Sequence, residues 1–323
     1  MKRRNFMSLM LGGAALPAFL RGASAQAYPT RPVRIVVGTA AGGGMDFAGR
    51  IIAQALTERL GQQFFVEDRP GAGTNVGTEF VLNSPPDGYT LLLVSAANAI
   101  NTTLYKNLNF NFIRDAAPIA TIARVPQIME VHPSVPANSV PEFIAYAKAN
   151  PHKINLASAG NGSVQQVAGE LFRMMAGIDM VDVPYNGAGP ALVDLLAGQT
   201  QVMFDTTPGS LPHIKAGRLR ALAVTTASRS EVLPDLPTVG EFVPGYEASQ
   251  WYGLAGPKNI SSGVIDRLNK EVNAAISEPG MKARLADLGG APLQGTPADF
   301  GALIVSETEK WGRVVKFSGA AAD

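Results

Sequence analysis

A short apolar run that breaks into consecutive glycines places the strongest constraint on how this chain can fold. The run covers residues 35–37, and residues 47–60 then carry apolar side chains at helical spacing, with Asp46 at the expected N-cap. Between them lie three consecutive glycines, Gly42, Gly43 and Gly44. A strand, a glycine loop and a helix N-terminus direct unpaired backbone N–H groups at one point. The segment is therefore predicted to bind an anion, or to be a glycine-rich turn that serves packing alone.

Two common anion-binding motifs are absent from this segment. The dinucleotide fingerprint G-x-G-x-x-G is not formed, because Phe47 stands where its third glycine would fall. A P-loop ends in Gly-Lys-Ser or Gly-Lys-Thr, and no glycine cluster of this chain is followed by that tripeptide. The glycine loop therefore belongs to neither of these nucleotide-binding motifs.

The first 25 residues have the pattern of a secretory signal peptide. Basic residues at positions 2–4 precede an apolar segment at 6–20, and a small-x-small cleavage site follows at 23–25. The apolar segment is too short to span a bilayer. The arginine pair at positions 3 and 4 also resembles a twin-arginine export signal. We expect a periplasmic protein that is cleaved after residue 25 or, alternatively, after residue 27.

The charge and the cysteine content exclude several classes of function. Removing residues 1–25 removes four basic residues and no acidic one, so the formal net charge changes from +1 to −3. A weakly acidic chain without a basic block is not expected to bind nucleic acid. Because the chain has no cysteine, it has no disulfide framework, no thiolate nucleophile and no cysteine metal site.

Beyond the first helix, short strands alternate with helices along the chain. Strands are predicted at 90–95, 155–158, 180–184, 202–205, 221–225 and 251–255, and amphipathic helices at 262–278 and 297–315. This alternation predicts an α/β fold with parallel sheets. At residues 38–46, 158–163 and 185–190, glycine and small polar residues lead from a strand into a helix, with Pro190 expected at a first helical position. Such loops gather at the carboxyl edge of a sheet, so they predict a ligand cleft lined by helix ends.

Residues that carry most catalytic chemistry are scarce. The chain has three histidines, and none has the spacing of a metal-binding motif. No G-x-S-x-G nucleophile elbow surrounds Ser158 or Ser163. We therefore predict no catalytic residue, no metal site and no cofactor. Asp46 is expected to cap a helix rather than to contact a ligand, whereas Asp205 either caps a turn or meets a polar group of a ligand.

Several sequence blocks, taken together, resemble one known family. The blocks are Tyr28-Pro-Thr-Arg-Pro-Val-Arg-Ile-Val-Val, Gly42-Gly-Gly-Met-Asp46, Asn161-Gly-Ser163, Val183-Pro-Tyr-Asn-Gly187, Gly217-Arg-Leu-Arg-Ala-Leu-Ala-Val224, Leu236-Pro-Thr-Val239 and Trp251-Tyr-Gly-Leu254. They resemble the Bug-type solute receptors of tripartite tricarboxylate transporters. The blocks follow the order of the family and run from Tyr28 to about Lys316, which is nearly the whole mature chain.

The resemblance implies a type II periplasmic-binding-protein fold, with two α/β lobes joined by crossover strands. On this basis residues 1–25 are the signal peptide, residues 28–124 and 252–323 form lobe 1, and residues 125–251 form lobe 2. The crossovers are expected near residues 124–131 and 249–254. The two lobes would close on a small ligand in the cleft between them.

The resemblance also implies a function. The protein would bind a small organic carboxylate, with no cofactor, and deliver it as a monomer to one large and one small integral-membrane transporter subunit. A receptor that presents its ligand to a signalling system, or an exported hydrolase, is the alternative. The family holds a carboxylate by backbone N–H groups and ordered water, without a fixed arginine.

The expected ligand-binding residues come from both lobes. Ser163 is placed at a helix N-terminus, where its hydroxyl and backbone can donate to an anion, and Tyr185 could supply a ring and a hydroxyl. Asn98 stands where the family often has a histidine. The full set of expected ligand-binding residues is Gly42, Gly43, Gly44, Ser95, Asn98, Ser158, Gly160, Ser163, Tyr185 and Asp205.

Overall fold

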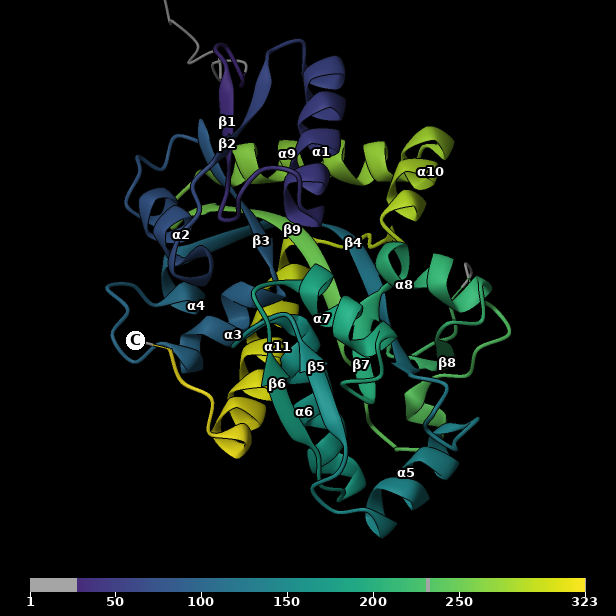
Figure 1. Ribbon diagram of the computed structural model, residues 1–323. Coiled ribbons are helices and arrows are strands. Elements are labelled where there is room, and N and C mark those ends of the chain that lie inside the picture. Colours follow the sequence, from purple (N-terminus) through teal and green to yellow (C-terminus); the bar gives the residue numbers. More distant parts are fainter. Residues whose placement is uncertain (1–27, 231–232, 323) are drawn as a thin grey trace, which may run out of the picture.

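The computed structural model describes residues 28–230 and 233–322. The predicted signal peptide and its cleavage sites lie outside the described residues. Figure 1 shows two groups of strands, each flanked by helices, with two long strands running from one group into the other. The chain thus forms two α/β lobes, as expected.

The first group of strands is built around a parallel core. Its order is β2 (Phe64–Asp68), β1 (Val33–Val37), β3 (Thr90–Ser95), β9 (Ser249–Pro257) and β4 (Ala116–Val131). The first three strands run parallel, whereas β9 is antiparallel to both β3 and β4. The short strand β10 (Ala291–Pro292) pairs with β4 on the other side. The expectation of parallel sheets holds for β1, β2 and β3 and is wrong at the two long strands.

The second group repeats this plan. Strands β6 (Val181–Pro184), β5 (Asn155–Ser158) and β7 (Val202–Thr206) are parallel to one another. The far end of β4 then runs antiparallel to β7 and to β8 (Arg220–Val224). Strands β5, β7 and β8 are mostly buried and apolar, whereas β6, at the edge of the sheet, is partly exposed.

Strands β4 and β9 connect the two groups. Residues 116–126 of β4 pair with β9, and residues 127–131 pair with β7. The change from one sheet to the other therefore falls between Pro126 and Gln127. At its start β9 is tied to the second group, because Ala248 donates a backbone hydrogen bond of 2.9 Å to Thr225.

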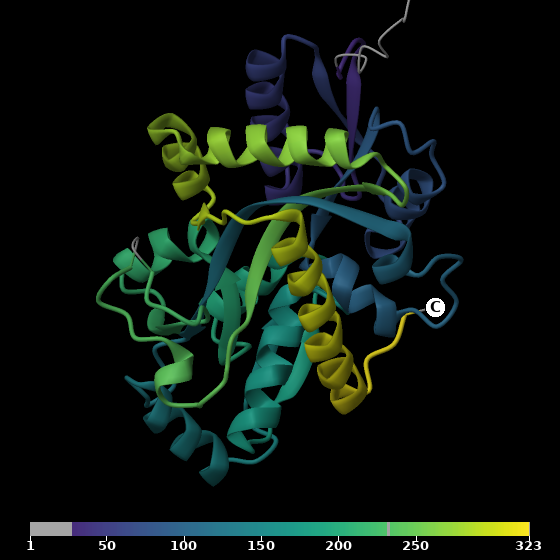
Figure 2. The ribbon, with the colours of Figure 1, turned by 180° about the vertical axis from the view of Figure 1, so that it is seen from behind.

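The helices cover the outer faces of the sheets. They are α1 (Gly44–Leu60), α2 (Asn75–Leu82), α3 (Ala96–Leu104), α4 (Phe112–Asp115), α5 (Val140–Ala149), α6 (Val164–Ala176), α7 (Ala188–Leu196), α8 (Thr207–Lys215), α9 (Ser262–Ser277), α10 (Pro279–Asp287) and α11 (Pro297–Ser318), with 3-10 turns η1 (Ala72–Thr74) and η2 (Val239–Glu241). In the reverse view, α11 (yellow) lies in front of the junction of the two groups (Figure 2). It contacts α3 of the first group and α6 of the second. None of the helices in this described part of the chain is long and apolar enough to cross a membrane.

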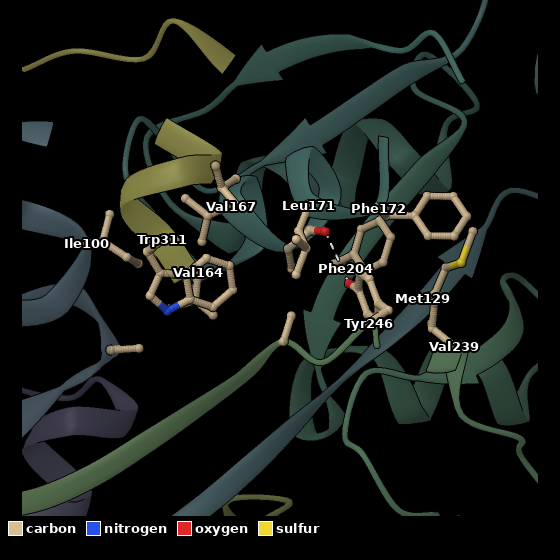
Figure 3. Close-up of a cluster of buried hydrophobic side chains, with 14 of the residues drawn as sticks. Ile100, Met129, Val164, Val167, Leu171, Phe172, Phe204, Val239, Tyr246 and Trp311 are labelled. Carbon is tan, nitrogen blue, oxygen red and sulfur yellow. Dashed lines mark hydrogen bonds between the residues drawn. The ribbon is translucent and has the colours of Figure 1, made fainter. Parts of the chain in front are cut away.

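The largest buried cluster of apolar side chains extends across both groups. Trp311 of α11 lies beside Ile100 of α3 and Val164 of α6 (Figure 3). Farther along, Phe172 of α6 packs against Phe204, with ring centroids 5.8 Å apart. A second cluster lies under α1 and α9. Helix α11 thus joins the two lobes through apolar packing at the back of the molecule.

Two expected helix starts are shifted. Helix α1 begins at Gly44 with Gly43 as its N-cap, so Asp46 lies in the first turn and is not the N-cap. Helix α7 begins at Ala188, which places Pro190 as its third residue. In both cases the glycine before the helix adopts the non-helical N-cap conformation without needing a side-chain cap. Strand β2 and helices α2, α3, α4, α5 and α10 were not predicted.

Candidate functional site

A cavity of about 350 Å³ lies between the two groups of strands. Its lining residues are mostly small or polar and come from both lobes. They are Thr39, Gly43, Gly44, Met45, Thr74, Ser95, Ala97, Gln127, Gly162, Ser163, Val164, Gln165, Thr206, Gln250 and Tyr252. No lysine, arginine, histidine, aspartate or glutamate is among these residues of the described chain.

Four helix N-termini converge on this cavity. Gly43, Ser95, Ser163 and Thr206 are the N-caps of α1, α3, α6 and α8, and each lines the cavity. The first N–H groups of a helix have no partner within the helix, and the helix dipole adds partial positive charge there. Two of these helices come from each lobe. These helix ends direct partial positive charge at the cavity without any cationic side chain, which suits a small anion.

The glycine loop before α1 is held by Asp46. Its carboxylate accepts a hydrogen bond of 2.8 Å from the backbone N–H of Gly42 and forms an ion pair of 2.6 Å with Arg50. Burial raises the pKa of Asp46, but the hydrogen bonds from Arg50 and Gly42 outweigh burial, so its pKa is lowered overall. Asp46 is therefore ionised at neutral pH and shapes the loop. It does not line the cavity.

A second loop, which the sequence did not single out, delivers Thr74 to the cavity. Thr74 has a φ of 90°, a conformation that is costly for a β-branched residue. A buried amide network lies beneath it: Asn98 donates a 2.8 Å hydrogen bond to Thr78, and Asn101 donates one of 2.5 Å to the carbonyl of Gly73. Asn98 also accepts the backbone N–H of Ser95 at 2.9 Å. The network positions Thr74 and Ser95, and Asn98 itself does not line the cavity.

The floor of the cavity is one face of the crossover strands. Gln250 pairs with Val125 and Tyr252 with Ala123, so Gln250, Tyr252 and Gln127 point to the same side of the β4–β9 ribbon. Burial raises the pKa of Tyr252 to about 12, although hydrogen bonding with Gln250 opposes this, so the phenol keeps its proton.

On the second lobe, Ser163 caps α6 by accepting the backbone N–H of Gln166 at 3.2 Å. Gln165 lines the cavity, and its amide nitrogen lies 3.5 Å from a carboxylate oxygen of Asp205. Asp205 is 2 % exposed. Burial raises the pKa of Asp205, while hydrogen bonds from Thr206 and Gln165 oppose the increase.

The two lobes come into contact at Gly162. A β-carbon at this position would lie 2.2 Å from the side chain of Leu104 in α3, so only glycine permits this close approach.

The structure brings four of the expected site residues to the cavity, and these are Gly43, Gly44, Ser95 and Ser163. The others lie nearby but do not line it: Gly42, Asn98, Ser158, Gly160, Tyr185 and Asp205. The backbone N–H of Gly42 is bound to Asp46. Tyr185 donates a 2.7 Å hydrogen bond to Asp194, and burial together with that carboxylate raises its pKa to about 12. Its hydroxyl is thus already engaged.

Among the lining residues that sequence reasoning missed are Thr39, Thr74, Gln127, Gln165, Thr206, Gln250 and Tyr252. Two signals could have found some of them. Residues 71–74 form a further glycine-rich turn between a strand and a helix. In addition, Gln127 is a polar residue inside an otherwise largely apolar strand, and a buried polar side chain there requires a partner.

Two larger cavities are lined by charged side chains. One, of about 670 Å³, lies on the opposite face of the crossover ribbon and is lined by Arg124, Glu247 and Lys282 among others. Another, of about 650 Å³, lies beside α2 and β3 and is lined by Arg34, Glu79 and Phe80 among others. Neither includes the N-cap of a helix. The cavity between the lobes is therefore the candidate binding site.

A cleft between two α/β lobes joined by crossover strands, and lined by helix N-termini, defines a periplasmic solute-binding protein. Comparison with known proteins agrees. Residues 48–319 match the family described as the tripartite tricarboxylate transporter family receptor. The chain belongs to this family of periplasmic receptors, whose members are not enzymes.

Similar proteins cover nearly the whole chain. BugT of Bordetella pertussis is 34% identical over 300 residues, which are 92% of each chain. The structure of Rpa4515 from R. palustris with adipate is 35% identical, has a TM-score of 0.78, and covers 91% of this chain and 99% of that one. The structure of MatC (Rpa3494) from Rhodopseudomonas palustris with bound malate is 29% identical, has a TM-score of 0.75, and covers 89% of this chain and 100% of that one.

Proposed function

We propose that this protein binds a small organic carboxylate in the cavity between its lobes and delivers it to the membrane subunits, one large and one small, of a tripartite tricarboxylate transporter. The observation that carries the proposal is the convergence of four helix N-termini on a cavity without charged side chains. Relatives with adipate and with malate support a carboxylate as the ligand class.

The energetics are consistent with a ligand that must be released again. A hydrogen bond to a charged acceptor contributes about 1.5–3 kcal/mol, and a helix end adds about 0.3–1 kcal/mol. After the cost of ordering the ligand, four or five such contacts leave about −8 kcal/mol, which is micromolar affinity. A fixed arginine would hold a carboxylate more tightly and slow its release.

The lobe boundaries follow from the crossover strands. In this proposal residues 28–124 and 252–323 form one lobe, residues 125–251 form the other, and the monomeric receptor bends at β4 and β9. The ligand gains contacts to helix ends of both lobes only when these approach each other. Export through the twin-arginine route is part of the proposal, and it is tested by comparing periplasmic yield in a host with and without that translocase.

The ligand class is tested by isothermal titration calorimetry with charge-matched probes. Adipate, malate and benzoate represent carboxylates of different shape, and cadaverine serves as a cationic control of similar length to adipate. At least one carboxylate should bind with micromolar affinity, and cadaverine should not bind. Binding of cadaverine, or of no member of a wider panel of mono-, di- and tricarboxylates, would overturn the proposal.

A further inference from the structure

The floor of the cavity differs chemically from its rim. The rim is built around helix N-termini, whose backbone N–H groups can only donate hydrogen bonds. The floor contributes the side-chain amides of Gln127 and Gln250, which can also accept them. A carboxylate matches these backbone donors, because both of its oxygens are acceptors. It leaves the acceptors of the floor without a partner.

Gln127 is the residue that most clearly lacks a partner. Its side chain is 0 % exposed, and neither its amide nitrogen nor its amide oxygen has a hydrogen bond within the described protein. Because both ends of the amide are free, this holds whichever way the amide is oriented. The amide oxygen of Gln250 is also buried and unpartnered. Buried amides are nearly always hydrogen-bonded, so a ligand group that pairs with them is favoured.

The backbone fixes Gln127 in place. Its N–H donates to the hydroxyl of Thr225 at 2.8 Å, and its carbonyl accepts the N–H of Thr225 at 2.9 Å. Gln127 is also the first residue of β4 that pairs with β7, opposite Thr206. The backbone of Gln127 is therefore held at the junction of the lobes, and its side chain, 0 % exposed, extends from this fixed point.

We propose that Gln127 determines ligand specificity by pairing its free amide with a hydroxyl group, so that the receptor prefers hydroxycarboxylates to the same acids without the hydroxyl. This inference rests on the proposed carboxylate-binding function. A hydroxyl both donates and accepts, which matches an amide with two free ends. The hydroxyl also supplies the donor that the amide oxygen of Gln127 or Gln250 requires.

An ammonium group fits this position less well. It would donate to the same oxygens, but it would carry a positive charge into a cavity whose described lining contains no carboxylate. Asp205 does not line the cavity, and its carboxylate contacts the side-chain amide of Gln165. Because a charge buried without a counter-charge is costly, the neutral hydroxyl is preferred to the ammonium of an amino acid.

The test uses pairs of acids that differ by one hydroxyl: succinate with each enantiomer of malate, glutarate with 2-hydroxyglutarate, and benzoate with each hydroxybenzoate. Calorimetry is carried out on the wild type, on Gln127→Met and on Gln199→Met. Methionine has nearly the length of glutamine. Gln199 is exposed and does not line the cavity, so it is the matched control. Thermal unfolding of each variant without ligand checks that it is folded.

In the wild type, one hydroxylated acid should bind about ten- to a hundredfold more tightly than its partner. Gln127→Met should reduce this ratio to nearly one by weakening only the hydroxylated acid, and Gln199→Met should keep it. Equal affinity for both members of each pair, or a ratio that survives in Gln127→Met, would overturn the inference and leave the carboxylate receptor standing. Tighter binding of succinamate or aspartate than of malate would mean that the amide of Gln127 pairs with an amide or ammonium group instead of a hydroxyl, and it would also overturn the inference. Absence of carboxylate binding would instead overturn the proposed function.

Discussion

The indole N–H of Trp251 in β9 donates a hydrogen bond of 3.0 Å to Oε2 of Glu307 in α11. The same oxygen accepts the indole N–H of Trp311 at 2.8 Å, so one carboxylate serves both tryptophans of the chain. Glu307 also forms an ion pair of 2.5 Å with Lys310. Trp251 lies on the face of the crossover ribbon away from the cleft, so this contact ties the ribbon to the helix behind it.

Replacing Glu307 tests how strongly this contact stabilises the fold. Glu307→Leu leaves two buried indole N–H groups without an acceptor, at about 1–3 kcal/mol each, whereas Glu307→Gln retains one acceptor oxygen. We expect a loss of several kcal/mol in the free energy of unfolding for the first variant and a smaller loss for the second. Urea denaturation measures both. Glu309→Gln, an exposed change on the same helix, should stay within about 0.5 kcal/mol of wild type.

Substitutions at Gly43 and Gly42 distinguish a role of the glycine loop in ligand binding from a role in loop conformation. A β-carbon at Gly43 meets nothing closer than 4.0 Å, and its φ is −86°, so Gly43→Val should fold normally. The valine would nevertheless shield the N-terminus of α1, and we expect at least a tenfold loss of carboxylate affinity by calorimetry.

Gly42→Ala is the matched change, because Gly42 has a φ of 90° and does not line the cavity. It should cost about 1–2 kcal/mol of stability with little change in affinity. Unchanged affinity in Gly43→Val would mean that the loop has only a structural role.

Because of Glu130, the free energy of unfolding should decrease as the pH rises. The side chain is fully buried and accepts a 2.8 Å hydrogen bond from Ser210, and burial raises its pKa from 4.5 to about 8. Between these two values the folded protein holds a proton that the unfolded chain has released. The free energy of unfolding therefore falls with increasing pH across this window, by at most about 1.4 kcal/mol per unit from this group.

Glu130→Gln keeps an acceptor for Ser210 and removes the ionisation. The variant should be clearly more stable than wild type at pH 8 and similar to it near pH 4.5. Chemical denaturation across this range measures the difference. If the difference between the two proteins did not change with pH, Glu130 would not be the group that holds the proton.

Ser163 and Tyr185 should respond differently to loss of a hydroxyl. Ser163 lines the cavity as the N-cap of α6, so Ser163→Ala should cost about 1 kcal/mol of stability and weaken ligand binding about two- to tenfold. The hydroxyl of Tyr185 is bound to Asp194 outside the cavity, so Tyr185→Phe should lower stability slightly and leave affinity unchanged. Thermal unfolding and calorimetry on both variants distinguish these effects. Weakened binding in Tyr185→Phe would extend the site to α7.

Closure about β4 and β9 should be visible in solution. In the proposed site a ligand would bridge helix ends from both lobes, so the contacts it adds would favour the closed form. Small-angle X-ray scattering should give a smaller radius of gyration at saturating ligand than without ligand. No change on saturation would indicate a rigid receptor.

Much of the architecture could be predicted because its signals are local. The strands at 90–95 and 155–158 were placed correctly, since a short apolar run between turn residues has one favourable conformation. The N-cap role of Ser163 was equally local. Strand β4 was harder, because Pro118, Arg124 and Gln127 interrupt its apolar pattern, and its extended form depends on partners in two sheets.

The sequence by itself determined the alternation of strands and helices, the glycine loops at helix N-termini and the family to which the chain belongs. Tertiary structure decided which of those loops meet and which polar atoms remain free. Asn98 and Tyr185 were equally plausible ligand contacts in sequence, yet their polar groups are bound to Thr78 and Asp194. Gln127 and Gln250, far apart in the chain, share one face of a ribbon. Hydrogen-bond partners of this kind are set by strand register and by packing between distant segments, which local sequence preferences do not specify.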